Sequence, residues 1–229
     1  MLLEGTVLNK NKALKTIISE GKNYREKLVN TVLLIVYRDR QDNELKYLEV
    51  EFQPHNYQHL TGVLMTEPQS EDSSEVTVLK HQAYKFYKRC IDKPFLTEKE
   101  ILLTKDTEVK LMALPYITQM IKITKMVGEF SGLGEKLESD YVIGGVNACL
   151  GISKNETNGR YFPRSCLKEN IKKVTKYTSQ VLVIFQKSIN DSEPYIKVKY
   201  VAKGVNLNRV IIPDVIRELI NLDSYKESQ

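Results

Sequence analysis

The sequence has few cysteines, few histidines and no long apolar run. Three cysteines, Cys90, Cys149 and Cys166, give no even set and no Cys-x-x-Cys pair, which predicts reduced thiols in a cytosol rather than a disulfide framework. The longest apolar run, Thr31 to Tyr37, is strand-sized, whereas a membrane-spanning helix needs about 20 residues. The first residues lack a basic segment followed by an apolar one, so we expect a cytoplasmic protein without a membrane partner.

Positive charge is concentrated in one part of the chain. Residues 160–209 hold eleven basic and three acidic residues, a net charge of +8, so the other 179 residues carry −3 of the total of +5. Such a segment attracts polyanions. Aromatic residues that can stack on bases lie among the cations. The pattern indicates contact with nucleic acid, and the alternative is a solvated basic surface with the aromatic residues in the core.

The order of helical and strand patterns indicates an α+β protein. We expect an N-terminal helical segment over residues 1–30, an α+β core over 31–209 and a C-terminal helix within 210–229. The core is expected to begin with a β-hairpin of Thr31 to Arg38 and Leu45 to Phe52 and to continue with central helices. An antiparallel four-stranded meander is then expected between Tyr141 and Lys203.

Local patterns within these segments give further expectations. The apolar spacing from Val76 to Ile91 predicts a helix, and Thr97 to Glu100 has the pattern of a capping box. The acidic stretch Thr66 to Glu75 has no apolar periodicity and predicts a mobile loop. In the last strand, alternation places Tyr195 on one face with three lysines, which are Lys197, Lys199 and Lys203.

Several short phrases occur in an order that resembles a nuclease family. They are Asn56-Tyr57-Gln58-His59-Leu60-Thr61-Gly62, Ala83-Tyr84-Lys85-Phe86-Tyr87, Lys110-Leu111, Gly144 to Gly151, Tyr161-Phe162-Pro163-Arg164-Ser165-Cys166-Leu167, Val183 to Lys187 and Tyr200 to Gly204. This order resembles the fourth of the phage-associated barnase–EndoU–colicin–RelE-like nuclease families over roughly residues 31–207. The resemblance implies a compact nuclease fold in which a four-stranded meander carries the active site. It also implies a phage or mobile-element setting in a bacterial cell.

Metal-free RNA cleavage requires one group that removes the 2′-hydroxyl proton, one that protonates the leaving 5′-oxygen, and cations for the phosphorane charge. Histidine suits proton transfer because its pKa lies near neutrality. We favour His59 as a catalytic residue because it lies in the family-like phrase. There Thr61 can orient the imidazole, and Gly62 lets the backbone approach a ligand. A surface or helix-capping histidine is the alternative.

Basic residues are the candidates for the remaining roles. Lys187 and Lys203 end two β-rich segments, and Lys110 lies in a family-like phrase, so these lysines are candidates for the acid or for phosphate contacts. The other candidates for binding nucleic acid are Thr61, Arg160, Tyr161, Ser165, Lys197 and Lys199. For Ser165, capping of the following helix is the alternative. We predict that His59 and at least two of Lys187, Lys199 and Lys203 face one cleft.

The sequence therefore predicts a metal-independent endoribonuclease of the toxin or phage-effector type, with no cofactor. RNA is the expected partner, and a protein inhibitor or antitoxin is a possible second one. A metal site is not expected at His55-x-x-x-His59 because Asn56 occupies the place of the zincin glutamate. The alternative is a non-catalytic nucleic-acid- or protein-binding module on the same fold. The small number of histidines favours that alternative, as does Arg164-Ser165 where the family often has asparagine.

Overall fold

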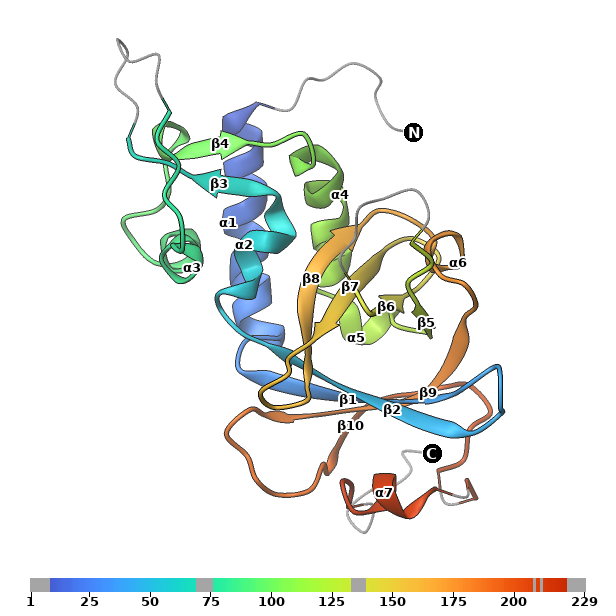
Figure 1. The fold of residues 1–229 in the computed structure, drawn as a ribbon. Helices are drawn as coiled ribbons and strands as arrows, with labels where there is room; N and C mark the ends of the chain where they lie inside the picture. Colours follow the sequence, from blue (N-terminus) through green and yellow to red (C-terminus); the bar gives the residue numbers. More distant parts are fainter. Residues whose placement is uncertain (1–8, 69–75, 133–138, 208, 211, 222–229) are drawn as a thin grey trace.

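The computed structural model describes residues 9–68, 76–132, 139–207, 209–210 and 212–221 (Figure 1). Its helices are α1 (Lys10–Lys27), α2 (Asn56–Thr61), α3 (Ala83–Ile91), α4 (Thr107–Ile117), α5 (Met120–Ile123), α6 (Ile171–Val174) and α7 (Asp214–Arg217), with a 3-10 turn η1 (Glu98–Glu100). Its strands are β1 (Thr31–Arg38), β2 (Leu45–Phe52), β3 (Val63–Met65), β4 (Ile101–Leu103), β5 (Met126–Glu129), β6 (Tyr141–Gly144), β7 (Cys149–Lys154), β8 (Tyr161–Leu167), β9 (Ser179–Ser188) and β10 (Lys197–Val201). The α+β class is confirmed.

Seven of these strands close into a barrel in the order β1-β2-β8-β7-β6-β5-β9, with β10 added beside β9. The ring closes because β9 pairs with β1 along one edge and with β5 along the other. A short parallel pairing of Val50 with Tyr161 joins β2 to β8. The predicted four-stranded meander is therefore wrong. Strand β8 pairs with β2 and β7, while β9 pairs with the distant hairpin strand β1.

The helices α1 to α4 lie together beside one end of the barrel (Figure 1). Helix α1 begins where the Asn9 side chain accepts a hydrogen bond from the Lys12 backbone N–H at 2.8 Å, which satisfies an otherwise unpaired donor. Its buried residues, including Ile17 and Tyr24, belong to one core that continues into the barrel interior. The helices thus fill the end of the barrel and share its core.

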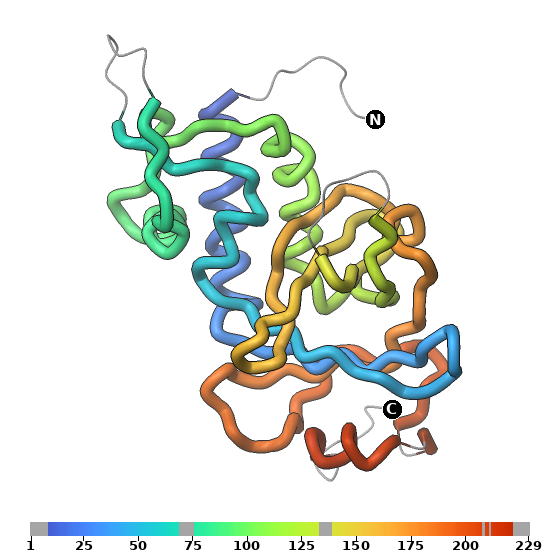
Figure 2. The backbone as a smooth tube through the Cα atoms, in the orientation of Figure 1, coloured from blue at the N-terminus to red at the C-terminus, as the bar shows by residue number. Residues whose placement is uncertain are grey.

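The strand β1 is buried on both faces, which explains its unbroken apolar sequence. Leu33 and Ile35 face the main core, whereas Val32 and Leu34 belong to a second cluster outside the barrel. That outer cluster includes Ile216 of α7, and Figure 2 shows the red segment containing α7 along the outside of the barrel. The helix expected within 210–229 covers Asp214–Arg217 in the described part of that segment, with Pro213 as its N-cap.

The predictions for the hairpin and the capping box agree with the structure. The hairpin strands have the predicted bounds, and Thr97 forms a capping box with Glu100, although the turn it caps is 3-10. The predicted helix from Val76 begins only at Ala83. Most of the acidic stretch Thr66 to Glu75 lies outside the described residues.

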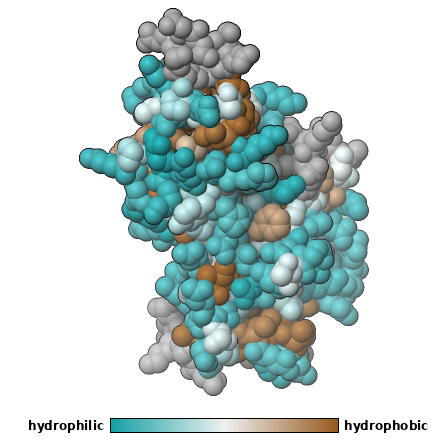
Figure 3. Space-filling view, turned by 60° about the vertical axis from the view of Figure 1, so that its left-hand side comes forward, coloured by the Kyte–Doolittle hydropathy of each residue, from teal (hydrophilic) through white to brown (hydrophobic). Residues whose placement is uncertain are grey.

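The predicted alternation in the last strand is wrong at two points. A β-bulge between Val198 and Tyr200 interrupts the pairing of β10 with β9, and Tyr195 is fully buried in the outer cluster rather than lying on a cationic face. The face of the molecule in Figure 3 is mainly hydrophilic, with small separate hydrophobic groups. Within the described residues, no helix has both the length and the apolar character required to cross a membrane.

Candidate functional site

Three segments with family-like phrases, α2, the first turns of α4 and β8, meet at one junction. Helix α2 ends at Gly62, whose φ of +67° is in the left-handed region. The Gly62 carbonyl accepts hydrogen bonds from the hydroxyls of Thr104 and Thr107, both at 2.7 Å. From β8, the Cys166 thiol donates to the Leu60 carbonyl at 3.2 Å. These contacts fix the position of α2 against both neighbours.

His59 lies at this junction among other basic side chains, and we call His55, His59, Lys110 and Arg164 the His59 site. The Lys110 ammonium donates a hydrogen bond to the His59 carbonyl oxygen at 3.0 Å. Burial lowers the pKa of His59 below its usual value, and the positive charges of Arg164, Lys110 and His55 lower it further. The lowered pKa favours the neutral imidazole, which is the form that can accept a proton.

Sequence reasoning did not select Arg164 as a site residue. In β8 the side chain of Arg164 is exposed between the buried residues Pro163 and Ser165. The residues Tyr161-Phe162-Pro163-Arg164-Ser165 do not alternate between apolar and polar, so they carry no local signal for this position. It depends on the pairing of β8 with β7, which shifts at Arg164, between Pro163 opposite Ile152 and Ser165 opposite Gly151.

Two of the predicted binding residues at the junction are buried and have structural contacts. The Thr61 hydroxyl donates to the Gln58 carbonyl at 2.8 Å and accepts from the Val63 N–H at 3.2 Å. Ser165 lies within β8 opposite Gly151. The predicted capping role of Ser165 is wrong, because the following helix α6 is capped by the side chain of Asn170.

Arg160 and Tyr161 lie where β2 meets β8. The Arg160 guanidinium is 3.7 Å from a carboxylate oxygen of Glu51 and 4.0 Å from one of Glu49. The Tyr161 ring packs edge-on against Tyr141, with ring centres 5.6 Å apart, and burial raises the pKa of its hydroxyl to about 12. The contacts of Arg160 are with β2, whereas the ring contact of Tyr161 is with β6. Nucleic-acid binding by either residue stays a prediction.

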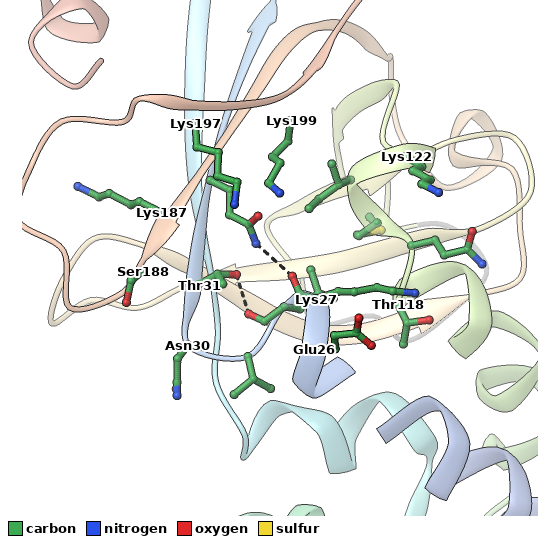
Figure 4. A pocket seen from close by; sticks show the side chains of 16 residues that line it. Glu26, Lys27, Asn30, Thr31, Thr118, Lys122, Lys187, Ser188, Lys197 and Lys199 are labelled. Carbon is green, nitrogen blue, oxygen red and sulfur yellow. Dashed lines mark hydrogen bonds between the residues drawn. The ribbon is translucent and has the colours of Figure 1, made fainter. Parts of the chain in front are cut away.

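The strand lysines surround a separate cleft of about 790 Å³, which we call the lysine cleft (Figure 4). It lies between the end of α1, the α4–α5 connection and strands β9 and β10, and its basic residues are Lys27, Lys122, Lys187, Lys197 and Lys199. Figure 4 shows Lys187 pointing away from the other lysines. Its ammonium donates to the Glu193 carbonyl at 2.8 Å and lies 4.4 Å from the centre of the Tyr195 ring.

The structure thus divides the predicted site residues into two groups. Lys187, Lys197 and Lys199 line the lysine cleft, whereas His59 and Lys110 lie at the junction of α2, α4 and β8 and do not line it. Lys203 is exposed beyond the end of β10 and is not among the lining residues either. The closed barrel accounts for the division, because β1 and β2 separate β8 from β9 on one side and β7, β6 and β5 separate them on the other.

A family model described as phage-Barnase-EndoU-ColicinE5/D-RelE like nuclease4 matches residues 17–203. The chain belongs to this nuclease family. The matched region includes the His59 site and all the residues that line the lysine cleft. Membership in the family implies that the substrate is nucleic acid. Searches of curated proteins and of solved structures give no match.

Proposed function

We propose that this member of the nuclease family is a metal-independent ribonuclease and that its reaction takes place at the His59 site. The observation that carries the proposal is the position of His59 beside the cations Lys110 and Arg164, whose charges lower the pKa of its imidazole. A proton acceptor and positive charge are the requirements of RNA cleavage by the 2′-hydroxyl. The convergence of three family-like segments at this place supports the same assignment.

In the proposed reaction, His59 removes the proton from the 2′-hydroxyl while the 2′-oxygen attacks the adjacent phosphorus. The bond from phosphorus to the 5′-oxygen breaks, and the Lys110 ammonium protonates that oxygen. Arg164 offers planar N–H donors to the phosphorane oxygens. The products are a 2′,3′-cyclic phosphate and a free 5′-hydroxyl. Lys110 and Arg164 thus supply the positive charge that the phosphorane requires.

The test is incubation of purified protein with total RNA in EDTA. We expect His59→Ala to lower turnover by roughly 10²- to 10⁴-fold while binding of RNA stays nearly intact. The matched control is His81→Asn, because His81 is exposed with a φ of +57° that asparagine tolerates. This control is expected to keep full activity.

Three outcomes separate the parts of the proposal. Equal turnover by intact protein and His59→Ala would remove His59 from the reaction. Activity that disappears in EDTA and returns with a divalent cation would contradict metal independence. Cleavage of an oligonucleotide that carries a 2′-deoxyribose at the scissile position would contradict attack by the 2′-hydroxyl.

A non-catalytic nucleic-acid-binding module is the second candidate. It is favoured by the distance in the fold between His59 and the lysine cleft, because a cationic cleft binds phosphates without any proton transfer. Binding of RNA with no cleavage by the intact chain is the result expected for this candidate. A role as a toxin or phage effector, and a protein inhibitor as partner, belong to the ribonuclease proposal.

A further inference from the structure

The lysine cleft has the charge of an anion-binding site. Its lining contains five lysines and one carboxylate, that of Glu26. Within the part of the chain that the structure describes, Lys27, Lys122, Lys197 and Lys199 form no ion pair with an acidic residue. Ammonium groups that line one cleft repel one another, and a bound anion relieves that repulsion.

Lys197 and Lys199 are held close together by the backbone of β10. The β-bulge at Lys199 interrupts the pairing of β10, and Figure 4 shows both side chains extending from β10 toward the end of α1. Burial lowers the pKa of Lys199, and the neighbouring Lys197 lowers it further. The contribution of Lys197 indicates that the two ammonium groups lie close together.

Other residues of the lining suit an unpaired base. Val29 and Ile121 are partly exposed apolar side chains in the lining and can pack against the face of a base. The exposed amides of Asn30 and Gln119 offer donors and acceptors to its edge. A double helix keeps its bases paired and cannot use such a lining. The volume of about 790 Å³ is in the range of sites for small organic groups.

We propose that the lysine cleft is a binding site for single-stranded nucleic acid, separate from the His59 site, in which the lysines hold successive phosphates and the apolar lining holds an unpaired base. The proposal deepens the proposed function, because it assigns the recognition of the strand to the cleft and the chemical step to His59. Glu26 lies at this site with the opposite charge, so it weakens the binding of phosphate.

The experiment measures binding of a labelled ten-nucleotide single strand with 2′-O-methyl groups, which cannot be cleaved through a 2′-hydroxyl. We expect Lys197→Ala/Lys199→Ala to weaken binding about 10-fold or more near physiological salt and to reduce the slope of log affinity against log salt by about 1.4. Glu26→Gln is expected to tighten binding. The matched control is Lys80→Ala/Lys85→Ala, which removes the same charge from exposed lysines at and just before α3.

Each other outcome contradicts the proposal. Unchanged affinity of the Lys197/Lys199 variant, or an equal loss in the Lys80/Lys85 control, would mean that the cleft is not the site. Equal affinity for a duplex of the same length would contradict the claim that the cleft recognises single strands. Tighter binding of poly-glutamate than of the oligonucleotide would assign the cleft to an acidic protein partner. The experiment measures binding and not cleavage, so it tests the lysine cleft even if the His59 site has no catalytic activity.

Discussion

The His59 site and the lysine cleft are both basic, but their side chains are held in different ways. At the His59 site the backbone is fixed by buried contacts, such as the Cys166 thiol on the Leu60 carbonyl and two threonine hydroxyls on the Gly62 carbonyl. In the lysine cleft, flexible side chains such as Lys197 are exposed and form no ion pair with an acidic residue among those that the structure describes. Proton transfer requires fixed distances, whereas attraction of phosphates tolerates movement. The rigid region thus suits chemistry and the flexible one suits binding.

The largest expected effect comes from removing packing beneath the rigid region. Leu60 is fully buried in the main core, so Leu60→Ala is expected to lower the free energy of unfolding by about 2–5 kcal/mol. Urea denaturation measures the change. Lys197→Ala in the cleft should change that free energy by no more than about 0.5 kcal/mol. Similar values for the two variants would contradict the difference between the two regions.

A smaller effect is expected at Gly62, where the backbone has a positive φ. A Cβ placed on Gly62 lies 3.1 Å from the Thr107 Cα and 3.1 Å from the Lys110 Cδ. Gly62→Ala should therefore destabilise the fold by more than the roughly 1–2 kcal/mol of left-handed strain alone, and it should also lower RNA cleavage because α4 carries Lys110.

The matched control for Gly62 is Gly204→Ala. Gly204 has a φ of +82°, and a Cβ there meets nothing within 4 Å, so this variant reports the backbone strain without the steric contact. We expect its loss of unfolding free energy in urea to be the smaller of the two, with cleavage unchanged. If both variants lost the same unfolding free energy, the contacts of the Gly62 Cβ with Thr107 and Lys110 would add nothing to the backbone strain. The prediction for Gly62 would then be wrong.

The smallest expected effect concerns the pKa of His59. Burial is the largest cause of the lowered pKa of His59, and the charge of Arg164 is the second. Arg164→Gln should therefore raise the pKa of His59, but only part of the way to its usual value. NMR titration of the imidazole measures it. Lys172→Gln is a suitable control, since Lys172 is exposed on α6 and does not contribute to the shift. A pKa that stays unchanged in Arg164→Gln would mean that the two side chains do not interact.

The same lowered pKa has a consequence for stability. Since the folded protein binds the His59 proton less tightly than the unfolded chain, the unfolded state is protonated first as the pH falls below about 6.5. The free energy of unfolding is therefore expected to decrease from pH 6.5 down through the folded pKa and to be unaffected by His59 above pH 6.5. His59→Gln should remove that part of the pH dependence in urea titrations.

Short-range features of the fold could be predicted from the sequence, and long-range pairings could not. The hairpin of β1 and β2 and the capping box at Thr97 depend on residues close in sequence, and both were predicted correctly. The closed barrel depends on Thr31 pairing with Ser188, far along the chain. An apolar strand that is buried on both faces can pair with many other strands, so its sequence does not predict which strand is its neighbour.

The candidate site shows the same division. The phrases around His59 and Lys110 were selected from the sequence, and the structure brings these two residues together. The lysines of β9 and β10 were assigned to the same cleft as His59 because a lone histidine cannot supply proton removal, proton donation and charge stabilisation together. The barrel places β8 and β9 apart, so one predicted site became two. Arg164 was missed because its exposed position depends on the pairing of β8.

The pairing of β9 with β1 also determines the order of events during synthesis. Strand β1 is complete after residue 38, but its partner β9 ends at residue 188. Until the ribosome has added those residues, a mainly apolar strand has one unpaired edge, which is a template for association with other chains. Chains that end before β9 are therefore expected to aggregate rather than to fold into a smaller nuclease.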